Sequence, residues 1–315
     1  MTGASGHRPV LLREALEGLA LRDNGWYVDA TYGRGGHSAE ILARLGAQGR
    51  LLALDKDPEA VAHGDSNCAA DERFAIRHAG FEELGAVVTP WLSGRRLDGV
   101  LFDLGVSSPQ LDQPTRGFSF AHDGPLDMRM NTAVGATAAE WLAFVSQQEL
   151  ADVLYRYGEE PRARQIAAAI VRAREAAPLT TTRELADVIA RVSRAKGRIH
   201  PATRAFQALR IAVNAELAAL ERALPQAVEL LAAGGRLVVI SFHSLEDRIV
   251  KRFLAREARG DEAYAGLPNV PAHARPRLKL VGRLVRPGAK EIDDNPRARS
   301  ARLRIAAREP LGRPA

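Results

Sequence analysis

The chain has 315 residues, of which 46% are hydrophobic and 26% are charged, with a formal net charge of +6 and one cysteine. This length allows one large domain or two, and the apolar content suffices for a substantial core. The single Cys68 excludes an intramolecular disulfide and a site built from several thiolates. No window approaches the roughly 20 continuous apolar residues of a membrane span, and residues 1–13 lack the apolar stretch of a signal peptide. We therefore expect a cytoplasmic protein without a membrane partner.

The positive charge is concentrated in two regions of the chain. Residues 275–315 carry twelve Lys and Arg against four Asp and Glu, and residues 160–210 carry eleven against four. The rest of the chain is therefore acidic overall. This asymmetry favours a polyanion such as nucleic acid as the partner, with residues 194–210 and the C-terminal strands as candidate surfaces. The alternative is that arginine simply covers ordinary solvated faces.

Short apolar runs alternate with helical patterns along the chain, which is typical of an α/β protein. We predict strands at 26–30, 51–54, 74–76, 100–104 and 237–242. A helix should follow the first strand at 38–45, and Pro58 should begin the next helix with Asp57 as its N-cap. The predicted fold class is α/β, with a doubly wound parallel sheet.

The carboxyl ends of the predicted strands all carry polar residues. In a doubly wound sheet, ligands bind beyond these ends. The residues that should converge there are Asp29, Asp55, the loop at Phe81, Asp103 and Ser241 to Ser244. This edge is the predicted site.

About 130 residues separate the fourth predicted strand from the fifth, far more than one crossover helix needs. Residues 138–195 are rich in Ala, Leu, Arg and Glu with helical periodicity, so we predict an inserted helical subdomain at 113–215 that recognises the substrate. The core would comprise 1–112 and 216–315. One helix with apolar residues from Phe206 to Leu220 should lead back to the sheet. Further strands at 278–285 and 303–306 should flank a turn at 294–296.

The first predicted strand runs into a glycine-rich loop that precedes a helix. Gly33, Gly35 and Gly36 permit a sharp turn and a close approach of the backbone to a ligand. A strand, a glycine loop and a helix in this order are typical of a nucleotide-cofactor site. A pyrophosphate-binding loop would have a third glycine where this chain has Ser38, so the dinucleotide pattern is incomplete.

Asp55 ends the second predicted strand, eighteen residues after His37 at the close of the glycine loop. An acid at this position suits the two hydroxyls of a ribose. Because no phosphate-binding lysine follows the glycines, the combination favours S-adenosylmethionine over a cofactor that carries phosphates. His37 should contact this cofactor or cap the following helix. The alternative is a tight strand-to-helix turn with a solvated acid.

The fourth predicted strand ends in a dense polar cluster that contains Asp103, Ser107, Ser108, Pro109 and Gln110. Asp103 could hold the cofactor or accept a proton from a target amine, while the hydroxyls and the amide could bind a base or the cofactor. The alternative is a turn that ends at Ser-Pro, since these residue types are common in turns. The position at the end of a strand favours a functional role.

His243 follows the fifth predicted strand at the same edge of the sheet and is a candidate substrate contact. Several other catalytic patterns are absent from the sequence. There is no G-x-S-x-G elbow, no H-E-x-x-H motif and no Walker lysine, so the hydrolase and ATPase functions lose support. We assign no metal ligand.

Eight motifs occur in order along the chain. They are Gly33–Ser38, Asp103–Asp112, Arg116–Phe120, Asp123–Met130, His200–Arg204, Phe206–Ile211, Ser241–Arg248 and Asn295–Ser300. Together they resemble the bacterial RsmH (MraW) family of 16S ribosomal RNA methyltransferases, nearly from end to end. The resemblance implies a class I fold, S-adenosylmethionine as the cofactor, and methylation of N4 of a decoding-centre cytidine, number 1402 in the target of the family.

The resemblance also implies roles for individual residues. Carried over by position, the cofactor contacts are Gly35, Gly36, His37, Asp55, Phe81, Asp103 and Gln110. Without the resemblance, Phe81 would be assigned to the core. Many amino methyltransferases carry an Asp/Asn-Pro-Pro-aromatic motif after the fourth strand, and this chain has Asp103 to Pro109 there instead.

We hypothesise that Asp103, Ser108 and His243 make the catalytic contacts and that the target cytosine is turned out of its stack to reach them. The residue that accepts the proton of the amine is left open. The expected partner is 16S rRNA within the 30S subunit, and a homodimer is also left open. Two other functions stay in consideration: a ribosome assembly factor that retains a cofactor fold, and a nicotinamide-dependent oxidoreductase.

Overall fold

The structure is a computed structural model that describes residues 9–68, 70–193, 200–264, 270–271 and 274–310. The chain forms two compact units: a core unit, Met1–Gly105 with Leu217–Ala315, and a helical unit, Val106–Glu216. The first boundary falls earlier than the predicted one at 112/113, because the short helix α5 (Ser108–Asp112) belongs to the helical unit.

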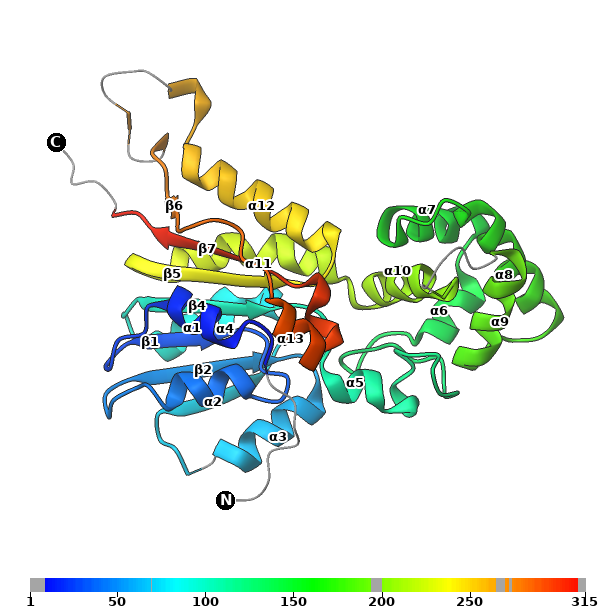
Figure 1. Cartoon of the computed structure of the whole chain (residues 1–315), viewed down its shortest axis with the longest axis horizontal. Helices are drawn as coiled ribbons and strands as arrows, with labels where there is room; N and C mark the ends of the chain where they lie inside the picture. The colour runs from blue at the N-terminus through cyan, green and yellow to red at the C-terminus, as the bar shows by residue number, and fades with distance from the viewer. Residues whose placement is uncertain (1–8, 69, 194–199, 265–269, 272–273, 311–315) are drawn as a thin grey trace. The chain divides into compact units, whose positions relative to one another are not determined.

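A seven-stranded sheet forms the centre of the core unit (Figure 1). Its strands are β1 (Trp26–Asp29), β2 (Arg50–Asp55), β3 (Phe74–His78), β4 (Leu97–Asp103), β5 (Leu231–Ser241), β6 (Leu278–Leu280) and β7 (Arg302–Arg308). The order across the sheet is β3-β2-β1-β4-β5-β7-β6. Strands β1 to β5 are parallel, and β7 lies antiparallel between β5 and β6. The five strands predicted for the parallel sheet and the α/β class are confirmed.

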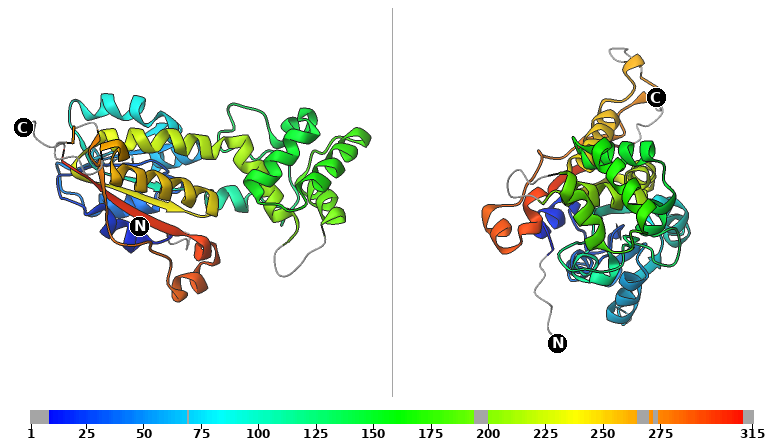
Figure 2. Two further views of the ribbon diagram at one scale, coloured as in Figure 1. Left: turned by 90° about the horizontal axis from the view of Figure 1, so that it is seen from above. Right: turned by 90° about the vertical axis from the view of Figure 1, so that its right-hand side faces the viewer.

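Helices cover both faces of this sheet (Figure 2). They are α1 (Leu12–Leu19), α2 (Gly36–Leu42), α3 (Pro58–Cys68), α4 (Leu84–Leu92), α11 (Glu216–Leu230), α12 (Ser244–Arg259) and α13 (Ala289–Asp294), with short 3-10 helices η1 (Phe81–Glu83), η3 (Glu262–Tyr264) and η5 (Pro296–Ser300). Alternate strand residues point to opposite faces. Val28 and Phe102 pack with α4, α11 and α12 on one face, and Tyr27 and Leu101 pack with α1 and α2 on the other.

The predicted start of α3 is confirmed at the level of single atoms. Pro58 is its first residue, and the backbone N–H of Glu59 donates to Asp57 Oδ1 at 3.0 Å. An N-cap side chain that satisfies one of the free N–H groups stabilises a helix by about 1 kcal/mol. The α3 helix therefore begins immediately after the strand that carries Asp55.

The C-terminal part of the core unit differs from the prediction. The strand expected at 278–285 ends at Leu280, because Gly282 takes a positive φ of 69° and turns the chain away. Val285 returns to form an isolated bridge with Leu303. The expected turn at 294–296 lies between α13 and η5, where the Asn295 side chain accepts a hydrogen bond from the N–H of Arg297.

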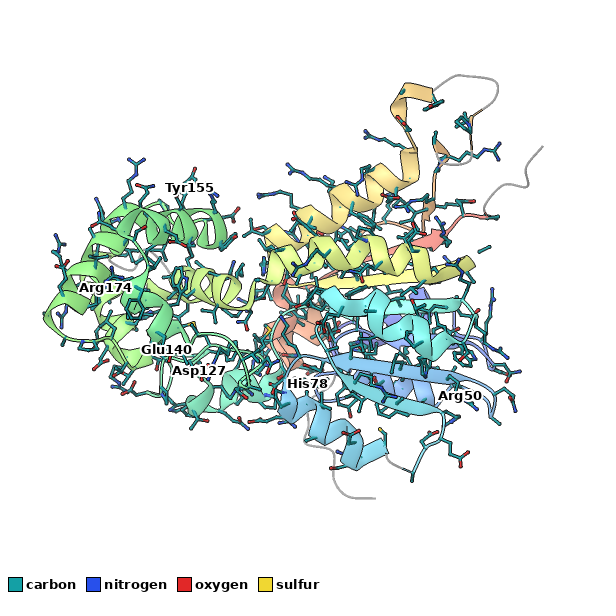
Figure 3. All side chains as sticks on the ribbon, turned by 180° about the vertical axis from the view of Figure 1, so that it is seen from behind. Arg50, His78, Asp127, Glu140, Tyr155 and Arg174 are labelled. Atoms are coloured by element: carbon teal, nitrogen blue, oxygen red, sulfur yellow. The ribbon has the colours of Figure 1, made fainter. Side chains whose placement is uncertain are left out.

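The helical unit has its own buried core. Its helices are α5, η2 (Pro114–Arg116), α6 (Ala138–Phe144), α7 (Gln147–Gly158), α8 (Ala163–Ala176), α9 (Thr182–Val192) and α10 (Ala202–Asn214). Leu150, Ile166 and Leu209 lie in the core shared by these helices. Figure 3 labels Glu140, which closes a capping box with Thr137 at the start of α6.

The single helix predicted from Phe206 to Leu220 is wrong. The chain forms α10 and α11 with a break at Ala215, which has a positive φ of 50°. The break is fixed by neighbours on either side: Arg210 donates to both Glu216 oxygens at 2.8 Å, and Asn214 Nδ2 donates to the Met128 carbonyl at 2.7 Å. Because the apolar spacing continues across the break, the sequence pattern does not reveal it.

Among the described residues, no helix combines the length and the apolar character that crossing a bilayer requires.

Candidate functional site

The glycine loop joins β1 to α2 at the carboxyl edge of the sheet. Gly33 and Gly35 have positive φ values of 56° and 72°, which glycine adopts without strain. The backbone N–H of Gly33 donates to Asp55 Oδ2 at 2.7 Å. The loop after β1 is therefore anchored to the end of β2, as expected for two predicted site segments at one edge.

The Asp29 carboxylate holds the glycine loop in place through two hydrogen bonds. It accepts from Ser38 Oγ at 2.6 Å and from the backbone N–H of Thr31 at 3.1 Å. The Thr31 hydroxyl in turn accepts from the backbone N–H of Asp103 at 2.7 Å. Burial raises the pKa of Asp29, and these hydrogen bonds oppose that effect. Asp29 therefore connects β1, α2 and β4, a scaffolding role for a residue 1% exposed.

Two glycines of the loop lie against side chains of the protein itself. A Cβ at Gly36 would come within 2.3 Å of Pro9 Cγ, and one at Gly35 would come within 2.5 Å of the Tyr32 hydroxyl. The Pro9 segment is tied down two residues later, where the N–H of Leu11 donates to Glu291 Oε1 at 2.6 Å. Close internal packing therefore requires these glycines, independently of any ligand.

The Asp55 carboxylate sits at the junction of β2 and α3. Its Oδ1 accepts from the N–H of Asp57 at 2.8 Å, while Oδ2 accepts from Gly33. Burial raises the pKa of Asp55 to about 6, although both backbone hydrogen bonds oppose the shift. Each carboxylate oxygen can accept a second hydrogen bond, so this side chain fits the two hydroxyls of a ribose.

His37 and Asp103 form a pair between α2 and the end of β4. The distance from His37 Nδ1 to Asp103 Oδ2 is 3.4 Å, and the His37 side chain is 5% exposed. Burial alone would lower the pKa of His37, but the hydrogen bond and the charge of Asp103 outweigh it and raise the pKa.

This pair also contains two atoms that lack partners. His37 Nε2 and Asp103 Oδ1 are buried and make no hydrogen bond within the described part of the chain. Buried polar atoms are nearly always satisfied, so such atoms in a cofactor loop need an explanation. An amine and a carboxylate at the end of a bound molecule are the groups that would satisfy Asp103 and His37.

Phe81 lies in η1, just after β3. Its ring meets Phe102 edge-on with centroids 5.8 Å apart, and Lys56 Nζ lies 6.0 Å from the ring centroid. Gln226 of α11 fixes this turn, because its amide donates to the Glu82 carbonyl at 2.8 Å and accepts from the N–H of Gly85 at 2.7 Å. The half-buried Phe81 ring therefore contacts the core and also lies at the carboxyl edge of the sheet. Figure 3 labels His78, the last residue of β3 at this edge.

Gln110 and Ser108 belong to the helical unit. Ser107 is the N-cap of α5, and Gln110 Oε1 accepts from the N–H of Ser107 at 3.0 Å in a capping box. Gln110 is 5% exposed, and Ser108 is the first residue of the helix. The alternative of a turn that ends at Ser-Pro does not hold, because Ser108 and Pro109 are the first two residues of a helix.

His243 is the N-cap of α12 at the end of β5. Its Nδ1 accepts from the N–H of Glu246 at 3.4 Å, and its Nε2 lies 3.1 Å from Glu246 Oε1. Because Nδ1 accepts this hydrogen bond, the proton of the neutral ring is assigned to Nε2, which is buried and makes no hydrogen bond within the described part of the chain. The Ser241 hydroxyl is also engaged, because it donates to the Arg302 carbonyl at 3.3 Å.

The core unit thus brings together most of the predicted cofactor residues. Gly35, Gly36 and His37 lie where the glycine loop enters α2, Asp55 accepts from Gly33 of that loop, and Asp103 pairs with His37. The sequence analysis missed Thr31, Ser38 as a partner of Asp29, and Pro9. Thr31 had a weak signal in the sequence, because a hydroxyl stands two residues after Asp29, the acid that ends the strand. Nothing in the sequence pattern indicates the contact between Pro9 and Gly36.

The chain is similar to known proteins over nearly its whole length. The model of the MraW methylase family matches residues 4–309. The chain belongs to this family. A curated relative from Nitrosococcus oceani, named ribosomal RNA small subunit methyltransferase H, is 54% identical over 309 residues, which cover 97% of this chain and 98% of the relative. The protein of the same name from Thioalkalivibrio sulfidiphilus is 57% identical over 308 residues, with 97% and 98% covered.

The family membership confirms the resemblance based on the eight motifs. It also agrees with the Rossmann-like class I sheet, and S-adenosylmethionine is the cofactor of this methyltransferase class. Among solved structures, an rRNA methylase from Streptococcus thermophilus is 13% identical with a TM-score of 0.44, and the match covers 98% of this chain and all of that one. That likeness is too distant to support an argument about the site.

Proposed function

We propose that the protein transfers a methyl group from S-adenosylmethionine to the N4 exocyclic amine of a decoding-centre cytidine in 16S rRNA. One observation carries the proposal: the His37–Asp103 pair, in which His37 and Asp103 Oδ1 are buried and Oδ1 is unsatisfied, lies beside a glycine loop that is bonded to Asp55. Methyl transfer to small-subunit rRNA is named in the relatives of this family. The target base, cytosine, and the methylated atom, N4, go beyond what the names of these relatives state and are proposed in addition.

The cofactor would be held by residues from three loops of the core unit. Asp55 would accept hydrogen bonds from the ribose hydroxyls, and the half-buried Phe81 ring would lie against the adenine. His37 and Asp103 would bind the carboxylate and the amine of the methionine part, which satisfies the two buried atoms without partners. Gly35 and Gly36 would bring the backbone close to the cofactor, and Gln110 stays in the proposed set on the strength of the family resemblance alone.

When bound, S-adenosylmethionine supplies an electrophilic methyl on a sulfonium. The N4 lone pair forms the new N–C bond while the C–S bond breaks, S-adenosylhomocysteine leaves, and N4 loses one proton. Since the N4 lone pair is delocalised into the ring, the protein must hold the amine in line with the methyl and accept that proton. Asp103 is the proposed acceptor, because a carboxylate oxygen has two lone pairs, so Oδ1 can take this proton beside the methionine amine while Oδ2 faces His37.

The other two catalytic candidates take narrower roles in this proposal. Ser108 would orient the base through its hydroxyl. His243 would donate a hydrogen bond or position α12, because its Nδ1 already accepts from the backbone of Glu246. The proposed order of importance is therefore Asp103, then Ser108, then His243.

The proposal also names the RNA partner and the cellular location of the reaction. We place the reaction in the cytoplasm on 16S rRNA within the 30S subunit, with the helical unit recognising the substrate and a homodimer as one arrangement to be tested. Arg204 and Arg210, two of the basic residues expected on the RNA surface, are engaged locally with the Glu159 carbonyl and with Glu216. Arg194, Lys196 and Arg198 lie outside the described residues.

The first experiment is methyl transfer from labelled S-adenosylmethionine to 30S subunits that lack the modification, followed by nucleoside analysis. We expect N4-methylcytidine as the product. A different methylated nucleoside contradicts the target atom and leaves the rRNA methyltransferase class intact. Cofactor binding without any transfer contradicts the enzymatic proposal and favours the assembly-factor function.

A further inference from the structure

Two of the three buried acids of α12, Asp247 and Glu257, are neutralised by arginines in β7 and just before β6. Asp247 accepts from Arg302 at 2.8 Å and from Arg304 at 2.7 Å. Glu257 accepts from Arg277 Nε at 2.6 Å. Part of the positive charge of residues 275–315 is therefore used in ion pairs within the core unit.

The outer side of α12 has a single sign of charge. All its exposed residues are basic: Arg248, Lys251, Arg252, Arg256 and Arg259. Their spacing of three and four places them on one side of the helix, and we call them the basic face of α12. An arginine-rich composition does not explain this face, because the exposed residues of α9 are balanced between Arg183, Glu184, Asp187 and Arg191.

A depression at the C-terminal end of α12 extends the basic face. It is lined by Arg252, Ala255, Arg256, Glu257, Arg259, Gly260, Asp261, Arg275 and Arg277. Its five arginines outnumber its two acids, Asp261 and Glu257, and Glu257 is paired with both Arg277 and Arg256, so the depression carries a net positive charge. Within the described part of the chain, neither Lys251 nor Arg252 forms an ion pair, and both are therefore available to a ligand.

We propose that the basic face of α12 binds the phosphate backbone of the RNA substrate. The inference rests on the proposed function, since it assigns a surface to the same substrate. Four of the five residues are arginines, whose planar fork matches phosphate oxygens. From Arg248 to Arg259 the face extends over about 16 Å, at 1.5 Å per residue. Because α12 begins at His243, RNA bound along it leads away from the edge that carries the cofactor residues.

The chemistry of α12 distinguishes this partner from a lipid surface. A helix that lies on a membrane exposes an apolar side next to its basic one. The apolar side of α12, with Val250, Phe253 and Leu254, is buried against the sheet. A polyanion without an apolar part fits a face that offers only cations.

The test compares two double variants of the full chain with equal changes of charge. Lys251→Gln with Arg252→Gln removes two cations of the basic face, and Arg13→Gln with Arg44→Gln removes two exposed cations beside α1 and α2, the helices on the other face of the sheet. Affinity for 30S subunits is measured by filter binding at several salt concentrations. S-adenosylmethionine affinity, measured by calorimetry, reports whether each variant is folded.

We expect the α12 variant to bind 30S subunits about tenfold more weakly, with a salt slope smaller by about 0.7 to 0.9 per lost phosphate contact. It should keep the wild-type cofactor affinity, and KM for RNA should rise more than kcat falls. Equal RNA affinities for the two variants overturn the inference while wild-type methyl transfer leaves the proposed function standing. Two further results overturn the inference. One is a loss of RNA affinity without a change in salt slope. The other is unchanged RNA binding together with weaker binding of polyglutamate, a polyanion that contains no phosphate.

Discussion

The carboxylate of Asp55 accepts a hydrogen bond from the backbone N–H of Gly33 at 2.7 Å, across 22 positions of sequence. This contact fixes the glycine loop to the end of the neighbouring strand. It also makes the ionisation of one buried side chain relevant to the shape of the proposed cofactor site. The pKa of Asp55 is raised to about 6 by burial, so its charge changes within an accessible pH range.

Cofactor affinity should therefore depend on the protonation of Asp55. The ionised carboxylate accepts hydrogen bonds from the ribose, so affinity should fall by about tenfold per pH unit as the pH drops below 6. The sign for stability is opposite. Because the folded pKa is above the unfolded one, the contribution of Asp55 to folding is complete below about pH 4 and is lost as the pH rises through 6.

Calorimetric titration of S-adenosylmethionine between pH 5 and 8 checks this prediction. In Asp55→Asn the affinity should be lower by about 10- to 100-fold at pH 7.5, which corresponds to the roughly 1.5–3 kcal/mol of a hydrogen bond to a charged group. Its pH dependence near 6 should disappear. Equal affinities of the wild-type protein at pH 5 and 7.5 would contradict the role of Asp55.

The charge of Asp103 should control the protonation of His37. Asp103→Asn removes the charge that raises the pKa of His37, so burial should dominate and the pKa should fall. An NMR titration of the His37 ring measures the change, and Asp65→Asn on the exposed side of α3 provides the control. We also expect methyl transfer to decrease by at least about 100-fold in Asp103→Asn. An unchanged His37 titration would show that the 3.4 Å contact has no electrostatic effect.

Gly36 should tolerate a side chain only when Pro9 is shortened. In Gly36→Ala the new Cβ would meet Pro9 Cγ at 2.3 Å, so we expect a loss of about 1–3 kcal/mol in the free energy of unfolding. In the Pro9→Ala background that atom is absent and the loss should be smaller. Urea unfolding of the four proteins in this double-mutant cycle gives the coupling energy. The same loss in both backgrounds would refute the proposed contact.

Ala215→Gly should stabilise the break between α10 and α11. The left-handed conformation costs an alanine about 1–2 kcal/mol, and glycine adopts it freely but loses about 0.5–1 kcal/mol in chain entropy. The net gain should be about 0.5–1 kcal/mol, measured by thermal unfolding. Ala212→Gly inside α10 is the matched control and should destabilise by about 1 kcal/mol. A destabilised Ala215→Gly variant would indicate that the helix is continuous.

The sequence predicted features that depend on local patterns. Strands β1, β2 and β4 are buried on both faces and therefore read as apolar runs, and Asp29, Asp55 and Asp103 mark their carboxyl ends. The break at Ala215 was missed because the residues that fix it include Met128, far away in sequence. The early end of β6 follows from the backbone conformation of Gly282, which composition does not specify.

The same limit applies to the site. His243 was selected because it follows a predicted strand. Its role as the N-cap of α12 was missed, because its pairing with Glu246 in a capping box can be recognised in the sequence only when the start of the helix is known. The pairing of His37 with Asp103 joins residues 66 positions apart and has no local signal. The resemblance to a family supplied the cofactor residues, and the structure supplies the hydrogen bonds that connect them.

The position of β7 has a consequence for how the chain folds during synthesis. This strand lies between β5 and β6, and its register pairs Ser241 with Arg302. At roughly 5–20 residues per second, about 3–12 s pass between the emergence of these two residues from the ribosome. For that time the outer edge of β5 is unpaired and β6 has no neighbour in the sheet. A nascent chain with such an open, apolar edge is a natural client for a chaperone that binds near the exit tunnel.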